Sequence, residues 1–307
     1  MHLYNTLSNY WKNLFLCKVR KIPLDAGFSC PNRDGNISRR GCVFCNEQGS
    51  GTGMNKENLS LREQYLTIRN RLLIKQKPLK FAAYLQSFSN TYCSPDILTK
   101  TLSELHDLED LAVLCIGTRP DCLNHEKIEI LKSFPCSEVW LDLGLQSADD
   151  KTLKIINRGH KAEDFSHACL MAHQSGLKIC AHVIAGLPGE SLEHFLNTIN
   201  FLNALPVSGI KIHNLYVCRN TALARTWEKG KYTPLEKSEY SQWTALALAR
   251  LRPDIIIHRI TGDPAPGELL SPDWAGSKMS IINEIRQIMT ENSLYQGKMF
   301  QEKLDTT

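Results

Sequence analysis

The sequence contains no run of about 18 apolar residues, the length that a helix needs to cross a bilayer. Its first residues also lack the continuous apolar core and the small-residue cleavage site of a signal peptide. Charge of one sign is not in large excess. The net charge is +4, and the pI near 8.4 lies below the value of about 9 that marks a nucleic-acid-binding surface. We expect a globular protein with no membrane association, for which RNA binding is permitted but not indicated.

The eleven cysteines do not form the pattern of a disulfide framework, because their number is odd and they are scattered through 307 residues. This usage predicts a reducing compartment, the cytoplasm. Three of them stand together as Cys30, Cys42 and Cys45, with the spacing Cys-x11-Cys-x2-Cys. The first gap is rich in Pro, Asn, Asp and Gly, which predicts a cysteine loop over residues 27–58.

Three thiolates in one loop are soft ligands, which select zinc or an iron-sulfur cluster over hard cations. A structural zinc site usually closes with four protein ligands, but no second CxxC or CxxxC follows, and the nearest histidines are His2 and His106. A cubane cluster held by three cysteines would leave one iron open to a small molecule. The residues alone leave both the zinc site and the iron-sulfur cluster open.

Two further motifs accompany the cysteines: FSCPNRDG from Phe28 to Gly35 and IGTRPDC from Ile116 to Cys122. With Phe44 directly before the last cysteine, the loop resembles the cluster loop of radical S-adenosylmethionine (SAM) enzymes, whose common spacing is the shorter Cys-x3-Cys-x2-Cys. The longer first gap is similar to that of the Elongator catalytic subunit. Together, the motifs resemble those of a bacterial family of stand-alone radical SAM proteins.

The resemblance implies that Cys30, Cys42 and Cys45 ligate three irons of a 4Fe-4S cluster, and that SAM binds the fourth iron. One electron from a reducing partner such as flavodoxin or ferredoxin would then cleave SAM to methionine and a 5′-deoxyadenosyl radical. That radical would abstract hydrogen from the substrate. In such enzymes the cofactors supply the hard chemistry, and the protein supplies binding and orientation.

The resemblance also implies a tRNA substrate, in which a carboxymethylaminomethyl group at C5 of the wobble uridine is trimmed to aminomethyl. The basic side chains expected to contact the RNA are Arg33, Arg39, Arg40 and Lys56. Two alternatives stay open. The chain could be a radical SAM enzyme acting on a small metabolite or peptide, or a non-catalytic protein whose three cysteines hold structural zinc.

Short apolar runs alternate with amphipathic helical stretches along the chain, which predicts parallel strands joined by right-handed crossovers. The expected strands are Lys18–Leu24, Phe81–Leu85, Leu111–Gly117, Val139–Leu145, Leu177–Ala185 and Ile210–Val217. The expected helices include Leu59–Lys77, Ile97–Leu108, Glu126–Ser133, Glu163–Gln174, Glu190–Leu205 and Glu236–Arg252. We predict an α/β fold, a partial (β/α)6 TIM-like barrel in residues 1–226, with a C-terminal helical extension and cap in residues 227–307.

Barrels of this kind carry their chemistry at the carboxyl ends of the strands, so the polar strand endings are the expected SAM contacts. The chain lacks the Glu of the family's Gly-Gly-Glu segment after the second strand, so Gln86 and Ser87 would supply polar contacts there. Asp142 replaces another usual Glu on the fourth strand. The resemblance assigns the fifth strand to adenine. The full set of expected cofactor-binding residues is Phe44, Gln86, Ser87, Gln146, Ser147, Arg158, Ile184 and Gly186.

Three further residues are expected to be catalytic: Arg119, Lys211 and His213. Arg119 could bind a carboxylate or phosphate through its guanidinium group, or it could pair with Asp121 as a structural ion pair. Alternation on the sixth strand places Lys211 and His213 on one face, predicted to point inward as substrate contacts or proton donors. A later apolar run ends in His258 and Arg259, which would add polar groups where the substrate enters.

Overall fold

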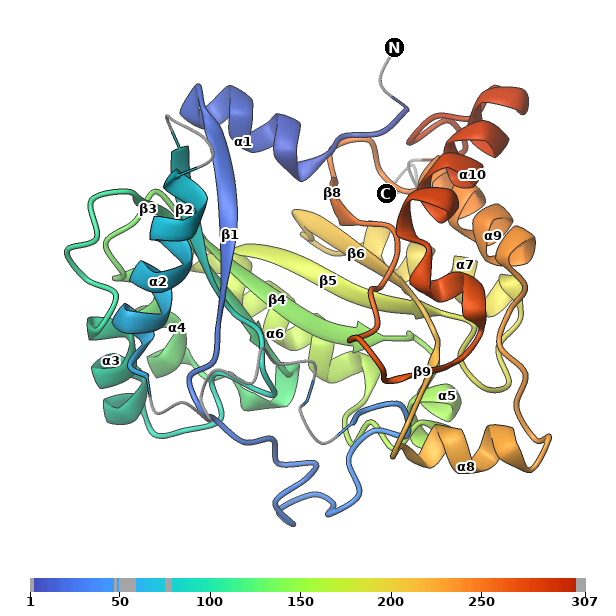
Figure 1. Cartoon of the computed structure of the whole chain (residues 1–307), viewed down its shortest axis with the longest axis horizontal. Helices are drawn as coiled ribbons and strands as arrows, with labels where there is room; N and C mark the ends of the chain where they lie inside the picture. The colour runs from blue at the N-terminus through green and yellow to red at the C-terminus, as the bar shows by residue number, and fades with distance from the viewer. Residues whose placement is uncertain (1–2, 47–48, 50–58, 75–78, 302–307) are drawn as a thin grey trace, which may run out of the picture.

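Seven parallel strands form one curled sheet in the computed structural model, which describes residues 3–46, 49, 59–74 and 79–301 (Figure 1). The order across the sheet is β1-β2-β3-β4-β5-β6-β8, and every neighbouring pair is parallel. The strands are β1 (Lys18–Leu24), β2 (Leu79–Leu85), β3 (Leu111–Thr118), β4 (Glu138–Gln146), β5 (Lys178–Ala185), β6 (Gly209–Asn214) and β8 (Ile256–Arg259). The predicted partial barrel is confirmed, with β8 as a seventh strand beyond the six expected βα units.

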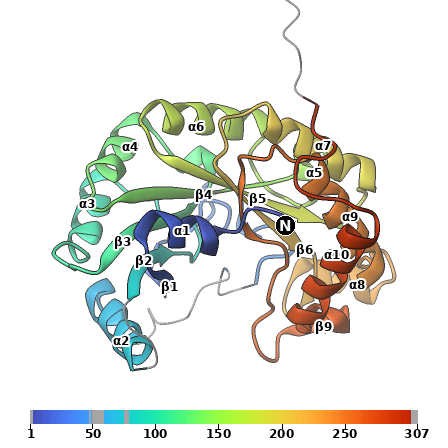
Figure 2. The same cartoon turned by 90° about the horizontal axis from the view of Figure 1, so that it is seen from above.

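Helices cover the convex face of the sheet, as Figure 2 shows for α3, α4, α6 and α7. Several begin at a residue whose side chain caps the first turn, namely Ser60 before α2, Ser94 before α3 and Asn124 before α4. The helices between the strands are α2 (Leu61–Leu73), α3 (Pro95–Ser103), α4 (His125–Lys132), α5 (Asp150–Ile155), α6 (Ala162–Gln174) and α7 (Leu192–Asn203). Strand β3 is buried along its whole length because both of its faces are covered.

The concave side of the sheet is closed at one end by α1 (Leu7–Phe15), a helix that is not among those expected above (Figure 2). Leu7 and Trp11 of α1 belong to a small apolar cluster with Trp140, Cys115 and Cys180 on the inner face of the strands. This cluster lies toward the amino ends of the strands. It leaves the inner face at their carboxyl ends open for polar groups.

The chain after β6 returns to the sheet before it ends in helices. The expected sixth run, Ile210–Val217, divides in two: β6 stops at Asn214, and β7 (Val217–Cys218) pairs antiparallel with β9 (Leu269–Ser271). The remaining elements are η2 (Pro120–Cys122), α8 (Ala222–Glu228), α9 (Lys237–Arg250), η3 (Asp273–Gly276) and α10 (Lys278–Glu291). Because β8 joins the main sheet, residues beyond 226 complete the half-barrel as well as covering it. The division into two domains at that position stays a prediction.

None of the helices in the described part of the chain combines the length and the apolar character that a bilayer crossing requires.

Candidate functional site

A cavity of about 460 Å³ lies at the carboxyl ends of the strands, within the size range of small-molecule sites. Its walls come from the cysteine loop and from the inner face of the sheet. Eleven of the residues predicted from the sequence line it: Cys30, Cys42, Phe44, Cys45, Gln86, Arg119, Gln146, Arg158, Ile184, Lys211 and His213.

The other three predicted residues lie buried outside the lining. The Ser87 hydroxyl has no hydrogen-bond partner, whereas the Ser147 hydroxyl contacts Glu190. The carbonyl of Gly186 accepts a 2.9 Å hydrogen bond from the hydroxyl of Tyr232. The roles assigned to all fourteen residues stay predictions.

Hydrogen bonds to neighbouring segments hold the cysteine loop in place. The backbone N–H of Arg33 donates to the Cys30 carbonyl at 2.8 Å, and that of Cys45 donates to the Cys42 carbonyl at 3.0 Å. Between these cysteines, Val43 donates to the carbonyl of Ile156, just after α5, and accepts from Leu223 of α8. The loop is therefore anchored by two helices that lie far from it in the sequence. Residues 47, 48 and 50–58 of the predicted loop, including Lys56, lie outside the described residues.

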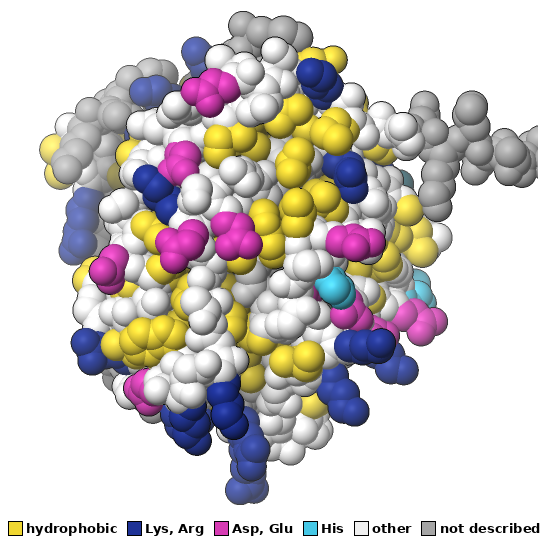
Figure 3. All heavy atoms as spheres, turned by 90° about the vertical axis from the view of Figure 1, so that its right-hand side faces the viewer, with side chains coloured by type: hydrophobic (Ala, Val, Ile, Leu, Met, Phe, Trp, Pro, Cys, Tyr) yellow, Lys and Arg dark blue, Asp and Glu magenta, His cyan; other side chains and the backbone are white. Residues whose placement is uncertain are grey.

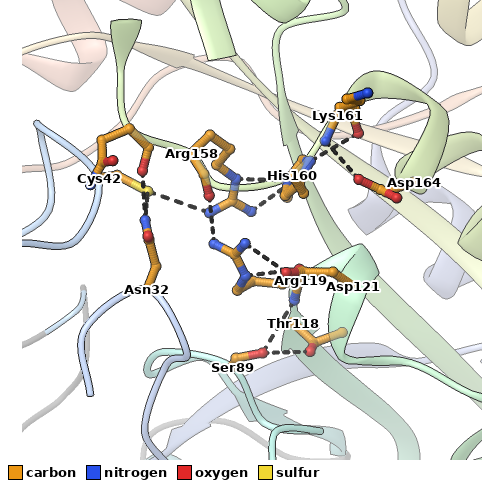
Figure 4. A network of polar contacts seen from close by, with 12 residues as sticks. Asn32, Cys42, Ser89, Thr118, Arg119, Asp121, Arg158, His160, Lys161 and Asp164 are labelled. Atoms are coloured by element: carbon orange, nitrogen blue, oxygen red, sulfur yellow. Dashed lines mark hydrogen bonds and ion pairs between the residues drawn. The ribbon is translucent and has the colours of Figure 1, made fainter. Parts of the chain in front are cut away.

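Two of the three sulfur atoms accept hydrogen bonds from cationic or amide groups. Asn32 Nδ2 and Arg158 Nη1 each lie 3.6 Å from Cys42 Sγ (Figure 4), and Arg33 Nη1 lies 3.5 Å from Cys45 Sγ. Burial, together with the neighbouring Cys42, raises the pKa of Cys45 to about 11 despite Arg33. A metal that displaces the thiol proton would bind where these donors already favour a negative sulfur.

Arg158 connects the loop to the sheet. Besides Cys42, its guanidinium group donates to the carbonyl of Gly144 on β4 at 2.7 Å and to His160 Nε2 at 2.8 Å. Burial and the positive charge of Arg158 lower the pKa of His160 to about 3, so its imidazole is neutral and accepts this hydrogen bond. His160 therefore positions Arg158 and is not available as a base.

Arg119 supports the same network from β3 (Figure 4). Its Nε and Nη2 atoms each donate to one carboxylate oxygen of Asp121 at 2.8 Å, and Nη1 donates to the Arg158 carbonyl at 2.8 Å. Only 2% of the Arg119 side chain is exposed. This geometry is the structural ion pair that the sequence left open beside a role in anion binding, and the predicted catalytic role stays untested.

The spacing of the cysteine sulfurs bears on the choice between zinc and an iron-sulfur cluster. Sulfurs on one tetrahedral zinc lie about 3.8 Å apart, as Zn–S bonds of about 2.3 Å require. Across the described residues, the one group of three His, Cys or acidic side chains with ligand atoms within 4.8 Å of one another is Asp142, Cys180 and His258. Cys30, Cys42 and Cys45 do not form such a group, so at least one pair of their sulfurs lies farther apart than one tetrahedral zinc ion requires.

Gly144 leaves room for Arg158 beside the cysteine loop. A Cβ atom at this position would lie 2.5 Å from Arg158 Nη2 and 2.6 Å from Gln146 Nε2. We expect Gly144→Ala to displace Arg158 from Cys42, to lower the unfolding free energy by about 1–3 kcal/mol, and to reduce the iron bound after reconstitution. Urea unfolding and iron analysis check this result.

The control for Gly144→Ala is Gly276→Ala, because a Cβ atom there meets only an ordinary contact with Leu269 at 3.8 Å. Equal iron loading in both variants would contradict the role given to Arg158.

A second polar group occupies the inner face of β4, β5 and β6. Lys211 Nζ pairs with the Asp142 carboxylate and donates to the Tyr84 hydroxyl at 2.9 Å. Burial alone would raise the pKa of Asp142, but Lys211 and Lys21 hold it well below its ordinary value. Burial and Lys211 lower the pKa of His182, which lies against the same carboxylate, to about 4.

Tyr84 and His182 are not among the residues predicted from the sequence, although both line the cavity. Each stands within an otherwise apolar strand, where a single polar residue is easily taken as part of the core. Once the inward face is known, alternation accounts for them, because Tyr84 of β2 shares a face with Gln86, which directly follows β2, and His182 shares one with Ile184 on β5.

The fold and the three-cysteine loop define the class, and comparison with known families gives the same answer. Residues 34–202 match the family described as the Radical SAM superfamily, and residues 207–291 match the Radical_SAM C-terminal domain. The first match covers more than half of the chain, and the chain belongs to this superfamily. It is therefore an enzyme whose cofactors are a 4Fe-4S cluster and SAM, as the resemblance of its motifs implied.

Among individual proteins, the chain is 34% identical to Bacillus subtilis YtqA over 97% of its own length and 93% of that protein. It is also 34% identical to Escherichia coli YhcC, over 90% of this chain and 89% of the other. A tRNA uridine(34) acetyltransferase of Dehalococcoides mccartyi is 32% identical over 57% of this chain and 38% of that protein. These matches confirm the resemblance to the stand-alone and Elongator-related groups.

Among solved structures, Elp3 of Methanocaldococcus infernus, with an N-terminal deletion, shares the fold with a TM-score of 0.69 at 18% identity. The match covers 91% of this chain and 64% of that one.

Proposed function

We propose that this radical SAM enzyme modifies tRNA at the C5 substituent of the wobble uridine, by trimming a carboxymethylaminomethyl group to aminomethyl. The observation that carries the proposal is the similarity to a tRNA uridine(34) acetyltransferase over more than half of this chain. The matched part of that relative is about a third of its length, so the similarity supports the kind of substrate rather than the relative's reaction.

The position of the cavity, at the carboxyl ends of the strands and beside the cysteine loop, supports this proposal. When bound, the reduced cluster supplies the electron that cleaves SAM to methionine and a 5′-deoxyadenosyl radical. The chain's own part is to hold the cysteine loop through Arg158 and Arg33, and to present an inner face with Lys211 and His213 to the substrate. A base turned out of an RNA loop can enter such a cavity at the strand ends.

Basic side chains at the same end of the molecule support contact with RNA phosphates. Arg39 and Arg40 of the cysteine loop are exposed, as are Arg225 and Lys229 of α8 and the turn that follows it. In Figure 3, Lys and Arg side chains gather along the lower edge, the end at which Figure 1 places the cysteine loop and α8. Arg33, also expected at the RNA, donates instead to Cys45 and to the carbonyl of Asn46.

We further propose that the enzyme acts in the cytoplasm, with flavodoxin or ferredoxin as the source of the electron. The eleven cysteines, all of them free in this structure, suit a reducing compartment.

The test is to incubate the reconstituted enzyme with SAM, a reductant and tRNA from a strain that lacks the gene for this chain. We expect tRNA to stimulate the formation of 5′-deoxyadenosine, and the carboxymethylaminomethyl nucleoside to be replaced by the aminomethyl one in mass spectra of digested tRNA. Identical nucleosides in the deletion strain and its parent would contradict the proposal. Deoxyadenosine formation that responds to a metabolite or peptide, but not to tRNA, would favour the alternative substrate class.

A further inference from the structure

Four polar residues on one side of the cavity have no part in holding the cysteine loop. We call them the β6–β8 site; they are Lys211, His213 and Asn214 of β6 and Arg259 of β8, and all four line the cavity. The contacts to the cysteine sulfurs come instead from the loop itself and from Arg158, which follows β4. In the sheet, β5 lies between β4 and β6, so the two groups occupy different parts of the cavity wall.

Asn214 presents an unused donor in a fixed direction. Its Oδ1 atom accepts hydrogen bonds from the hydroxyl of Thr261 at 3.0 Å and from the backbone N–H of Gly262 at 2.7 Å. The Gly262 N–H fixes which side of the amide is oxygen, because a backbone N–H cannot accept a hydrogen bond from an NH₂ group. The Nδ2 atom is buried without a partner in a residue that is only 3% exposed. A buried amide donor in a folded protein normally has a hydrogen-bond acceptor.

The charges around Asn214 show which kind of acceptor fits. Lys211 and Arg259 bring two positive charges to the site, and Lys21 lies behind it, over the ring of Tyr84 at 4.9 Å. The buried carboxylate that faces them is Asp142, which pairs with Lys211. Asp263 lies 3.7 Å from Arg259, but it is held more closely by Lys278, at 2.7 Å.

His213 lies in the same positively charged environment. Burial and the charge of Arg259 keep its pKa well below the ordinary value, and its Nε2 atom is buried without a partner. The β6–β8 side of the cavity thus combines two cationic side chains with buried polar atoms that have no hydrogen-bond partner.

We propose that the β6–β8 site binds the oxyanion of the substrate, with Arg259 and the Nδ2 atom of Asn214 as its donors. This inference rests on the proposed function, and it names two sources for the oxyanion: a carboxylate on the modified base or the phosphate beside it. The planar fork of an arginine matches either group with two parallel hydrogen bonds. The site places that anion two strands away from the segment that carries Arg158, and so orients the substrate across the cavity.

The experiment uses two anticodon stem-loop RNAs that differ only in the wobble uridine, one with a carboxymethylaminomethyl group and one with an aminomethyl group. Dissociation constants are measured for the reconstituted wild type, for Arg259→Gln and for Arg259→Lys. Lys278→Gln is the matched control, since Lys278 binds the same Asp263 from outside the cavity lining. The dissociation constant for SAM is measured in parallel.

If the anion is the carboxylate, we expect the wild type to bind the carboxylated RNA about 10- to 100-fold more tightly than the other RNA. Arg259→Gln should lose this preference, Arg259→Lys should keep part of it, and Lys278→Gln should keep all of it. If the anion is the phosphate, Arg259→Gln should weaken the binding of both RNAs by a similar factor.

Three results would overturn the inference. Unchanged binding of both RNAs by Arg259→Gln would remove Arg259 from the site, while leaving the proposed function intact. A parallel loss of SAM affinity would assign the site to the cofactor. Failure of the wild type to bind either RNA would remove the proposed function, and the inference with it.

Discussion

Replacing Cys30, Cys42 or Cys45 by alanine is expected to abolish the cleavage of SAM. The resemblance predicts each sulfur as one of three cluster ligands, and the nearby nitrogens of Arg33, Arg158 and Asn32 are donors that cannot replace a lost thiolate. We expect each variant to lose the visible absorption of the cluster after anaerobic reconstitution. Production of 5′-deoxyadenosine after reduction should fall to the level of the blank. Iron and sulfide analysis, the visible spectrum and chromatography of the reaction check this result.

The matched control for these variants is Cys17→Ser, which changes a cysteine between α1 and β1 that does not line the cavity. Its cluster and its activity should equal those of the wild type. Zinc without sulfide in the wild-type protein would contradict the iron-sulfur assignment. Full activity in any one of the three alanine variants would show that the cluster has a different third ligand.

Asp142→Asn is expected to give the largest loss of stability among single substitutions in the barrel interior. Both partners of the Asp142–Lys211 pair are almost fully buried, with side chains 0% and 7% exposed. The substitution leaves the Lys211 ammonium group with the Tyr84 hydroxyl but without a counter-charge. Removing one member of a buried ion pair costs about 3–5 kcal/mol of unfolding free energy. Urea unfolding of both proteins measures the difference.

An exposed ion pair supplies the comparison. Lys237→Gln breaks a pair with Glu284 whose side chains are 37% and 22% exposed, and should cost at most about 1 kcal/mol. The double substitution of Asp142→Leu with Lys211→Met should recover much of the stability, since an apolar pair needs no charge compensation. A loss in Asp142→Asn as small as that in Lys237→Gln would mean that the Asp142–Lys211 pair is solvated.

The same carboxylate predicts a dependence of stability on pH. The folded pKa of Asp142 lies well below the ordinary value of about 3.9, so its ionised form stabilises the folded state at pH values above about 4. That contribution is lost as the pH falls through the folded pKa. The difference in unfolding free energy between the wild type and Asp142→Asn should therefore be largest near neutral pH and shrink in acid.

The strands of the half-barrel could be predicted from the sequence because burial on both faces leaves a continuous apolar run, as in Leu111–Thr118. Helix α1 was not among the expected helices, although Leu7, Trp11 and Leu14 recur at helical spacing after the capping residue Thr6. The two-residue strand β7 could not be predicted, because its partner β9 follows some fifty residues later. A local sequence pattern is a weak predictor of an element whose stabilising contact comes from a distant segment of the chain.

The residues of the candidate site likewise divide into those that the sequence predicts and those that only the structure identifies. Cys30, Cys42 and Cys45 could be found from their spacing and from the turn-forming residues between them. Tyr84 and His182 could not be distinguished from core residues until the strands were curled and one face enclosed a cavity. Arg259 was noticed at the end of its strand, but the contribution of β8 to the main sheet was needed to bring it opposite Lys211 and into the cavity lining.

The sequence by itself determined the family and the order of strands and helices, and it predicted the cysteine ligands, because motifs and hydrophobic periodicity are local properties of the chain. The tertiary structure alone decided which polar side chains face one another. Arg119 and Asp121 are two residues apart and pair within one loop, whereas Lys211 and Asp142 meet across the barrel interior. Such a meeting depends on strand order, register and curl, which are set by packing of the whole sheet. The electrostatics of the cavity therefore belong to the fold and could not be read from any one segment.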